Sequence, residues 1–280
     1  MNIGFLGAGK VGTALGRHMV QRGVSLAGYA SRNPASARAA AHATGTAAYA
    51  TPAQLLEACD CVFLTVPDDA LPGAWAQLRA LPLAGKRVCH CSGLLSSAVF
   101  AGAEGLGAAA YAVHPMLAVP SREAPAQLFE GACFTVEGSA AHLDEICGLL
   151  DTLGNAYQVI DKDKKPLYHA ACVTVSNLVN GLCRVGEGLF MQCGLDADFS
   201  QKAWHSLFLS QAQNICSSGT GPSLTGPIER GDANTVHTHL ECLDAPAKDI
   251  YRLLSRMLVS IAEEKHPGRD YATIKKELLS

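Results

Sequence analysis

The sequence lacks any long hydrophobic run: no stretch of its 280 residues approaches the roughly 20 uninterrupted apolar residues that span a bilayer. Met1 leads straight into the apolar run at 3–6 without a basic segment, so we expect no signal peptide. Charged residues make up only 17%, and the net charge is −3. This balance favours neither nucleic acid nor an anionic membrane as a partner. We expect a cytoplasmic protein.

Metal-binding and disulfide patterns are also missing. The 11 cysteines include no C-x-x-C pair, and their odd number and apolar surroundings predict that most are buried small hydrophobic residues. His237 and His239 lie two residues apart in a probable helix, where their side chains diverge. No H-x-x-x-H pattern occurs either, so we expect no metal.

The apolar residues, 49% of the chain, form a pattern typical of two domains. Residues 1–160 alternate short apolar runs with Ala-rich helical stretches, which predicts βαβ units and a mainly parallel, Rossmann-type sheet. The expected strands are 2–6, 25–30, 61–66, 87–92, 109–113, 133–137 and 156–160. The expected helices between them are 11–22, 34–43, 52–58, 70–80 and 142–153.

Strand signals stop after residue 160. A charged connector at 161–165 precedes long helical candidates at 166–192, 200–217 and 247–264, and the stretch 219–232 is dense in Gly and Pro. The sequence therefore predicts an α/β chain with a dinucleotide-binding domain at 1–160 and an all-helical domain at 161–280.

A glycine motif marks the expected cofactor site. Gly7-Ala8-Gly9-Lys10-Val11-Gly12 is a G-x-G-x-x-G that follows an apolar strand and opens a helix. Its glycines permit a tight turn, close approach of a pyrophosphate and close packing of helix on strand. In this strand–turn–helix setting, the motif predicts dinucleotide binding.

The end of the second expected strand distinguishes NAD from NADP. An NAD site usually has an acidic residue there, whereas this chain has Ser31-Arg32-Asn33. A guanidinium at this place suits a 2′-phosphate, so we expect NADP. The alternative is that Arg32 is a solvated loop residue. Val66-Pro67-Asp68-Asp69 and Ser92-Gly93 end two further strands and should line the dinucleotide, with Ser92-Gly93 nearer the nicotinamide.

The expected helix at 166–192 and the residue before it carry the candidate chemistry. Spacings of i, i+4, i+7 and i+11 place four polar residues on one face: Lys165, His169, Cys172 and Ser176. The opposite side is apolar: Leu167, Ala171, Leu178 and Leu182. Such a helix is expected to be buried, with its polar face toward a cleft. A charged helix start followed by a core histidine is the alternative. His114, before Pro115 at a strand end, is either catalytic or structural.

Taken together, these motifs resemble one family. They are the glycine loop, Ser92-Gly93, His114-Pro115, the segment Lys165–Ala171 with Ser176-Asn177, and the segment Leu224–Asp232. The family pairs a Rossmann-like NADP-binding domain with a C-terminal helical domain of unknown function. It is related to β-hydroxyacid dehydrogenases, ketopantoate reductase and pyrroline-5-carboxylate reductase. The resemblance covers essentially the whole chain.

The resemblance implies an NADP-dependent oxidoreductase that acts on a small carboxylate, and a homodimer formed through the helical domain. In β-hydroxyacid dehydrogenases a helix presents a lysine and, four residues on, an asparagine; the matching positions are Lys165 and His169. We expect a branched 2-oxo acid such as ketopantoate as the substrate. Reduction of an imine of the pyrroline-5-carboxylate type and non-catalytic NADP-binding regulation are the alternatives.

Each candidate residue then has an expected role. Lys165 would polarise or protonate the developing alkoxide, and His169 would orient the substrate or relay the proton. His114 would position nicotinamide or substrate. Arg230 would bind the substrate carboxylate, with Asp232 holding it. The remaining expected substrate-binding residues are Ser92, Gly93, Ser176, Asn177 and Thr225.

Overall fold

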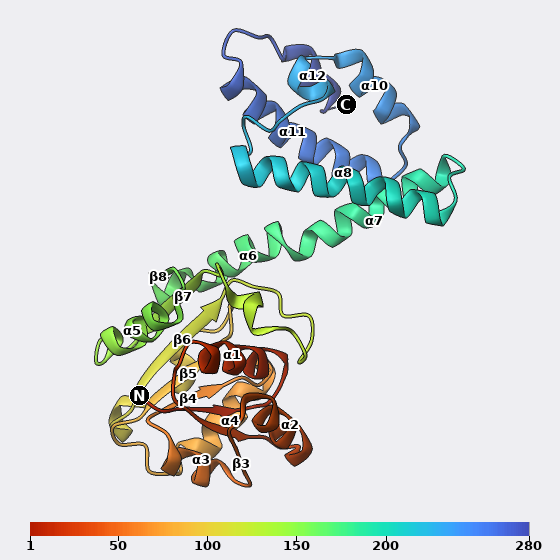
Figure 1. The fold of residues 1–280 in the computed structure, drawn as a ribbon. Coiled ribbons are helices and arrows are strands. Elements are labelled where there is room, and N and C mark those ends of the chain that lie inside the picture. The colour runs from red at the N-terminus through yellow and green to blue at the C-terminus, as the bar shows by residue number, and fades with distance from the viewer. Residues whose placement is uncertain (280) are drawn as a thin grey trace. The chain divides into compact units, whose positions relative to one another are not determined.

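The computed structural model describes residues 1–279, which divide into two compact units, the first Met1–Val175 and the second beginning at Ser176 (Figure 1). An eight-stranded sheet organises the first unit, in the order β3-β2-β1-β4-β5-β6-β7-β8. Its strands are β1 (Ile3–Leu6), β2 (Leu26–Ala30), β3 (Ala47–Tyr49), β4 (Cys61–Leu64), β5 (Arg87–His90), β6 (Ala109–Pro115), β7 (Phe134–Gly138) and β8 (Tyr157–Val159).

Strand direction determines where a ligand can bind. Strands β1 to β6 run parallel, β7 pairs antiparallel with β6, and β8 runs parallel to β7. The chain leaves β1 toward β2 on one side and later returns to β4 on the other side. In open sheets the cofactor crevice lies at this change of direction, outside the carboxyl ends of the strands. The mainly parallel sheet confirms the predicted Rossmann-type architecture.

Helices cover both faces of the sheet. They are α1 (Lys10–Gln21), α2 (Pro34–Thr44), α3 (Pro52–Ala58), α4 (Leu71–Leu78) and α5 (Leu143–Leu153). The unit ends with α6 (Lys165–Val175) and also contains the short 3₁₀ turns η1 (Asp68–Ala70), η2 (Ser97–Phe100), η3 (Glu104–Leu106), η4 (Ala126–Phe129) and η5 (Lys162–Lys164). Alternation along β1 directs Ile3 and Phe5 into a core with α1, α2 and α5, and Leu6 into a second core with α3 and α4.

The second unit is helical, as the sequence predicts. Its helices are α7 (Asn177–Gln192), α8 (Ala197–Ser218), α9 (Pro227–Arg230), α10 (Ala233–Cys242), α11 (Ala247–Lys265) and α12 (Ala272–Glu277). Val236, Val259 and Tyr271 lie in its buried core. Within residues 1–279, no helix is long and apolar enough to cross a membrane.

The single helix expected at 166–192 is interrupted. Ser176 adopts φ −127° and ψ −77°, which ends α6 and lets α7 begin at Asn177. The preceding residues 173–175 are β-branched, and the Thr174 hydroxyl donates to the Ala170 carbonyl, so this turn holds its helical conformation poorly. Ser176 consequently does not continue the face of Lys165. The first unit includes α6, whereas the predicted domain boundary at 160/161 precedes it.

The expected burial of this helix is also wrong. Leu167 is 72% exposed and Leu178 is 59% exposed, and Lys165 is the only buried residue of α6. No other part of the described chain covers these apolar side chains. The prediction that most cysteines are buried is wrong as well, because only three of the 11 are buried: Cys59, Cys61 and Cys89. The sequence pattern identifies an apolar face but not the surface that covers it.

Candidate active site

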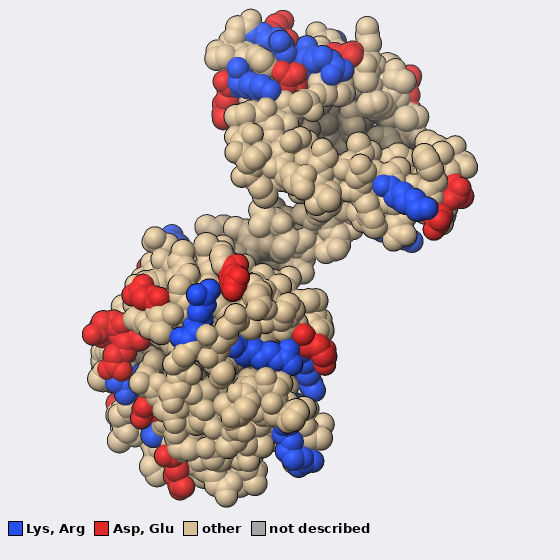
Figure 2. All heavy atoms as spheres, viewed as in Figure 1, with Lys and Arg blue, Asp and Glu red and all other residues tan. Residues whose placement is uncertain are grey.

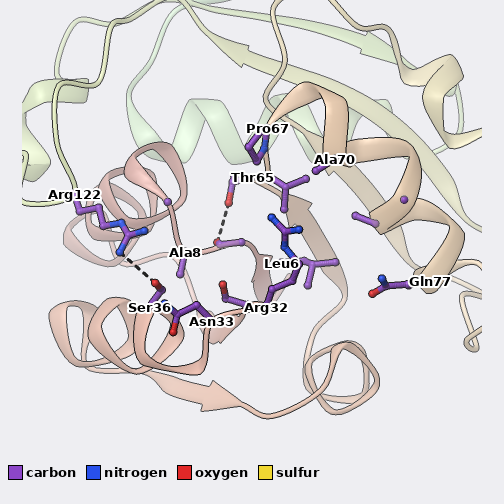
Figure 3. Close-up of a pocket in the computed structure, with 16 residues that line it drawn as sticks. Leu6, Ala8, Arg32, Asn33, Ser36, Thr65, Pro67, Ala70, Gln77 and Arg122 are labelled. Atoms are coloured by element: carbon purple, nitrogen blue, oxygen red, sulfur yellow. Dashed lines mark hydrogen bonds between the residues drawn. The ribbon is translucent and has the colours of Figure 1, made fainter.

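A cavity of about 510 Å³ opens at the carboxyl ends of β1, β2 and β4 (Figure 3). The first residues after these three strands, Gly7, Ser31 and Thr65, all line it. The complete lining is Leu6, Gly7, Ala8, Gly9, Ser31, Arg32, Asn33, Ser36, Thr65, Val66, Pro67, Ala70, Gly73, Ala74, Gln77 and Arg122. The cavity thus lies where the sheet order predicts a dinucleotide.

The glycine loop packs tightly against Thr65 at Gly7 and Gly12. Gly7 has φ +114°, and a Cβ there would lie 2.7 Å from the carbonyl oxygen of Thr65. A Cβ on Gly12 would lie 2.3 Å from Thr65 Oγ1, which itself donates to the Gly7 carbonyl over 2.9 Å. Thr65 therefore holds the loop closed against β4. Gly9 precedes α1, whose free N–H groups and positive dipole suit phosphate oxygens.

Seven of the ten predicted cofactor residues line the cavity, and three do not. Lys10, Val11 and Gly12 form the first turn of α1 and are absent from the lining. Gly12 acts through packing against Thr65 rather than by contact with the cavity. The lining contains two charged residues, Arg32 and Arg122, and within the described chain none of its members is acidic. This charge balance fits the 2′-phosphate of NADP better than a free ribose hydroxyl.

A buried lysine lies at the end of the neighbouring strand β5. Lys165 is 1% exposed, and its Nζ donates a 2.9 Å hydrogen bond to the carbonyl oxygen of Ser92. Burial lowers the pKa of Lys165, and the acidic groups of Glu137 and Asp68 partly offset this effect. Lys165 begins α6 with helical dihedrals despite the proline that follows it.

Ser92 connects this lysine with the cofactor cavity. Its hydroxyl donates to Asp68 Oδ2 over 2.7 Å and accepts from the N–H groups of Leu94 and Leu95. Asp68 directly follows Pro67, which lines the cavity. The lysine and the cavity therefore share one continuous edge of the sheet.

The rings of His114 and His169 lie against Gly93, and Tyr168 contacts one of them, His114. His114 Nδ1 lies 2.7 Å from the Tyr168 hydroxyl, and the rings of His114 and His169 meet edge to face at 6.3 Å. A Cβ on Gly93 would lie 2.6 Å from His169 Cδ2 and 2.9 Å from His114 Nε2. Burial, reinforced by the charge of Lys165, lowers the pKa of His114 to about 4. His114 is consequently neutral near pH 7.

The structure brings together five predicted residues: Ser92, Gly93, His114, Lys165 and His169. Asp68 belongs to the predicted turn Val66-Pro67-Asp68-Asp69, but its contact with Ser92 comes from the structure. Sequence reasoning missed Tyr168 and Arg122. Tyr168 lies three residues after Lys165, a helical spacing that could have identified it. Arg122 lies in a long loop, and no local pattern marks it.

The other predicted substrate residues lie in the second unit. Ser176 and Asn177 form the start of α7, and Ser176 Oγ hydrogen-bonds Asn177 Oδ1 over 3.1 Å. Thr225 and Arg230 are exposed, before and at the end of α9. Asp232 caps α10, where its carboxylate accepts from the N–H and hydroxyl of Thr235 at 3.1 and 2.6 Å. The geometry thus gives Asp232 a structural contact.

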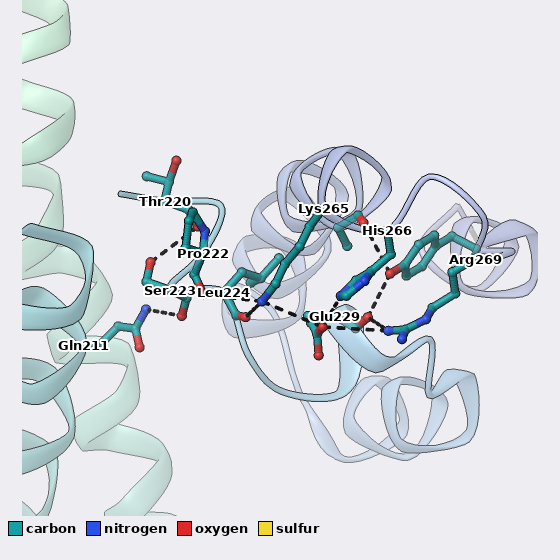
Figure 4. A network of polar contacts seen from close by, with 11 residues as sticks. Gln211, Thr220, Pro222, Ser223, Leu224, Glu229, Lys265, His266 and Arg269 are labelled. Carbon is teal, nitrogen blue, oxygen red and sulfur yellow. Dashed lines mark hydrogen bonds and ion pairs between the residues drawn. The ribbon is translucent and has the colours of Figure 1, made fainter. Parts of the chain in front are cut away.

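The segment around α9 is held by ionic contacts (Figure 4). The Glu229 carboxylate pairs with His266 and lies 3.8 Å from both Lys265 and Arg269. Lys265 also donates to the Leu224 carbonyl over 2.8 Å. These contacts fix both ends of the exposed turn that carries Thr225. Among residues 1–279, no group of His, Cys, Asp and Glu could hold a metal ion.

Two family models match parts of the chain. Residues 2–92 match the family model "NADP oxidoreductase coenzyme F420-dependent". Residues 132–258 match the domain of unknown function DUF2520. No curated protein matches the chain. NADP, which Ser31-Arg32 predicts, is the cofactor of the N-terminal family.

Several solved structures share the fold over nearly the full length. Protein TM1727 from Thermotoga maritima is 25% identical, with a TM-score of 0.74 and coverage of 94% of this chain and 99% of that one. A putative NADP oxidoreductase, BF3122 from Bacteroides fragilis, is 22% identical, with a TM-score of 0.67 and coverage of 92% of this chain and 98% of that one. A reductive aminase from Aspergillus terreus, in complex with NADPH and ethyl-5-oxohexanoate, is 16% identical, with a TM-score of 0.66 and coverage of 98% of each chain. The chain therefore matches an NADP oxidoreductase model in its N-terminal part and DUF2520 in its C-terminal part.

Proposed function

We propose that the chain reduces the carbonyl group of a small carboxylate with NADPH, and that a branched 2-oxo acid such as ketopantoate is the substrate. One observation carries this proposal: the buried Lys165 ammonium donates to Ser92 at the sheet edge that also forms the cofactor cavity. A buried, cationic donor at such a position is suited to a negative charge that develops on oxygen.

Lys165 is the proposed proton donor. Bound NADPH supplies a hydride to the carbonyl carbon, and Lys165 delivers a proton to the carbonyl oxygen, which yields the hydroxy acid. Burial lowers the pKa of Lys165, which brings the ammonium closer to the acidity that such a transfer requires. The Ser92 carbonyl orients the ammonium through the 2.9 Å hydrogen bond.

The two histidines are given different roles. His114 is neutral near pH 7, so it is suited to positioning rather than to proton donation. Its 2.7 Å hydrogen bond with Tyr168 fixes the ring orientation. His169, four residues after Lys165 and half-buried, is proposed to orient the substrate beside the lysine.

The substrate carboxylate is assigned to the second unit. The exposed Arg230 offers a bidentate partner, and Ser176, Asn177 and Thr225 offer hydrogen bonds. The ionic contacts of Glu229 that order the neighbouring turn support this assignment. It otherwise rests on the family resemblance.

Imine reduction is the second candidate function, with a substrate of the pyrroline-5-carboxylate type. The fold likeness to a reductive aminase favours it. In that reaction Lys165 would stabilise charge or return a proton to nitrogen, and the same cofactor site would serve. A non-catalytic NADP-binding regulator would need the cavity but not a buried lysine beside it.

A homodimer in the cytoplasm completes the proposal. Large apolar side chains of the second unit are more than half exposed, among them Leu207, Leu209 and Met257. Figure 2 shows that much of the visible face of this unit carries no charged side chain. Exposed apolar surface of this extent is typical of a subunit interface.

A substrate panel tests the function. NADPH oxidation is followed with ketopantoate and other 2-oxo acids, and separately with cyclic imines that include pyrroline-5-carboxylate. Turnover of 2-oxo acids alone supports the first candidate, and turnover of imines alone supports the second. NADPH binding without turnover of any panel member would contradict both and favour the regulator.

A further inference from the structure

An arginine from outside the predicted cofactor motifs lines the cavity. Arg122 belongs to the segment 116–133 between β6 and β7, far in sequence from the glycine loop. Its guanidinium Nη1 donates to Ser36 Oγ over 3.2 Å, in the first turn of α2 (Figure 3). Arg122 is exposed, so its charge carries little desolvation penalty.

The backbone around Arg122 is fixed to α1. Arg17 Nη1 donates to the carbonyl oxygens of Arg122 and Ala124, each over 3.0 Å. Ala124 and Phe129 are buried in the core that includes α1. Two elements that form the cofactor site, α1 and α2, therefore hold the segment in place. The position of Arg122 is defined before a ligand arrives, which reduces the entropy lost on binding.

Ser36 indicates which part of the dinucleotide Arg122 faces. A pyrophosphate belongs at the glycine loop and the start of α1, whereas α2 follows β2 and Ser31-Arg32, where the adenosine ribose belongs. In Figure 3 the Arg122 side chain reaches toward Ser36, and Arg32 extends into the cavity from the other side. A phosphate bound at Ser36 would meet the Arg122 guanidinium, and Arg32 lines the same cavity.

We infer that Arg122 is a second determinant of NADP specificity, which binds the 2′-phosphate together with Arg32 and Ser36. A phosphate monoester carries a charge of about −1.5 to −2 at pH 7. A single arginine would leave part of this negative charge uncompensated, whereas Arg32 and Arg122 together carry two positive charges. Within the part of the chain that the structure describes, no carboxylate lines the cavity. The inference rests on the binding of NADP in this cavity, not on the reaction.

Binding measurements test the inference without turnover. Kd values of NADPH, NADH, 2′,5′-ADP and 5′-AMP are measured for the unmodified protein, Arg122→Ala, Arg122→Lys and Arg32→Ala. We expect Arg122→Ala to weaken NADPH and 2′,5′-ADP about tenfold or more, the usual effect of a lost charge-assisted hydrogen bond. NADH and 5′-AMP should change less than about twofold. Arg122→Lys should give an intermediate loss, because lysine keeps the charge but not the forked geometry.

A matched control removes an arginine from α2, the helix that carries Ser36. Arg38 is exposed on α2 and does not line the cavity, so Arg38→Ala should leave all four Kd values unchanged. An equal loss for all four ligands in Arg122→Ala would place Arg122 on a shared part of the dinucleotide and overturn the inference, as would no loss at all. If the protein binds NADPH but does not reduce the proposed substrates, these titrations still test the role of Arg122. If NADPH does not bind the unmodified protein, both the inference and the proposed function are wrong.

Discussion

The ammonium of Lys165 and the carbonyl of Ser92, 73 positions apart in the sequence, are joined by a buried hydrogen bond of 2.9 Å. This contact attaches the first turn of α6 to the carboxyl end of β5. It also leaves a fully buried cation with one main-chain partner and with the carboxylates of Glu137 and Asp68 in its surroundings. An ammonium has three N–H donors, so Lys165 could donate to a substrate oxygen and keep its bond to Ser92.

Lys165→Met should reduce kcat about a hundredfold or more and leave the Kd of NADPH nearly unchanged. The methionine keeps the apolar stem but cannot donate a proton, and a general acid typically contributes this much to the rate. His169→Ala should have a smaller effect. Lys164→Met, at an exposed neighbouring position, serves as the control. Unchanged turnover in Lys165→Met would rule out the assigned role.

Gly93→Ala should lower turnover without weakening NADPH binding. The new Cβ would lie 2.6 Å from His169 Cδ2 and 2.9 Å from His114 Nε2, so both rings must move. A displacement of about 1 Å in a positioning group can cost a hundredfold in rate. Gly105→Ala is the matched control, because no heavy atom lies within 4 Å of its Cβ. Equal activity of the two variants would show that the rings do not need their present positions.

Stability should decrease as the pH falls from about 6.5 toward 4. Burial lowers the pKa of His90 and of His114 from 6.5 to about 4 in the folded chain. Between these values the unfolded chain binds protons that the folded chain excludes, so the free energy of unfolding declines with decreasing pH. Urea denaturation at several pH values measures this slope.

The same experiment on His90→Asn separates the contribution of one group. His90 Nδ1 accepts from the Ser92 N–H over 3.1 Å, and the asparagine oxygen can replace this acceptor without titrating. The slope between pH 4 and 6.5 should therefore become shallower in the variant. A slope identical to that of the unmodified protein would exclude His90 as a source of the pH dependence.

The unmodified protein should be a dimer at micromolar concentration, and Leu209→Glu should shift it toward monomer. Leu209 is 58% exposed on α8, so the glutamate should not disturb the fold of one subunit, while it would place a charge in an apolar interface. Light scattering measures the mass, and Arg38→Glu in the first unit is the control. A monomeric unmodified protein would refute the proposed assembly.

The glycine loop and the strand pattern were sufficient to predict the sheet domain, because turn chemistry and apolar periodicity act over a few residues. Strand β3 escaped prediction, since Ala47–Tyr49 has only three residues and none is β-branched. Part of the site was predictable because it also follows a local pattern. Lys165 and His169 follow a helical period, whereas Arg122 reaches the cavity through contacts with Arg17 and Ser36 that depend on the tertiary fold.

The division of the chain at Ser176 places the cofactor cavity and the Lys165 cluster in the same compact unit. The residues proposed to hold NADPH and to deliver the proton therefore belong to one folding unit. A second half from a related chain would leave both in place, so we expect chimaeras joined at Ser176 to keep their preference for NADPH.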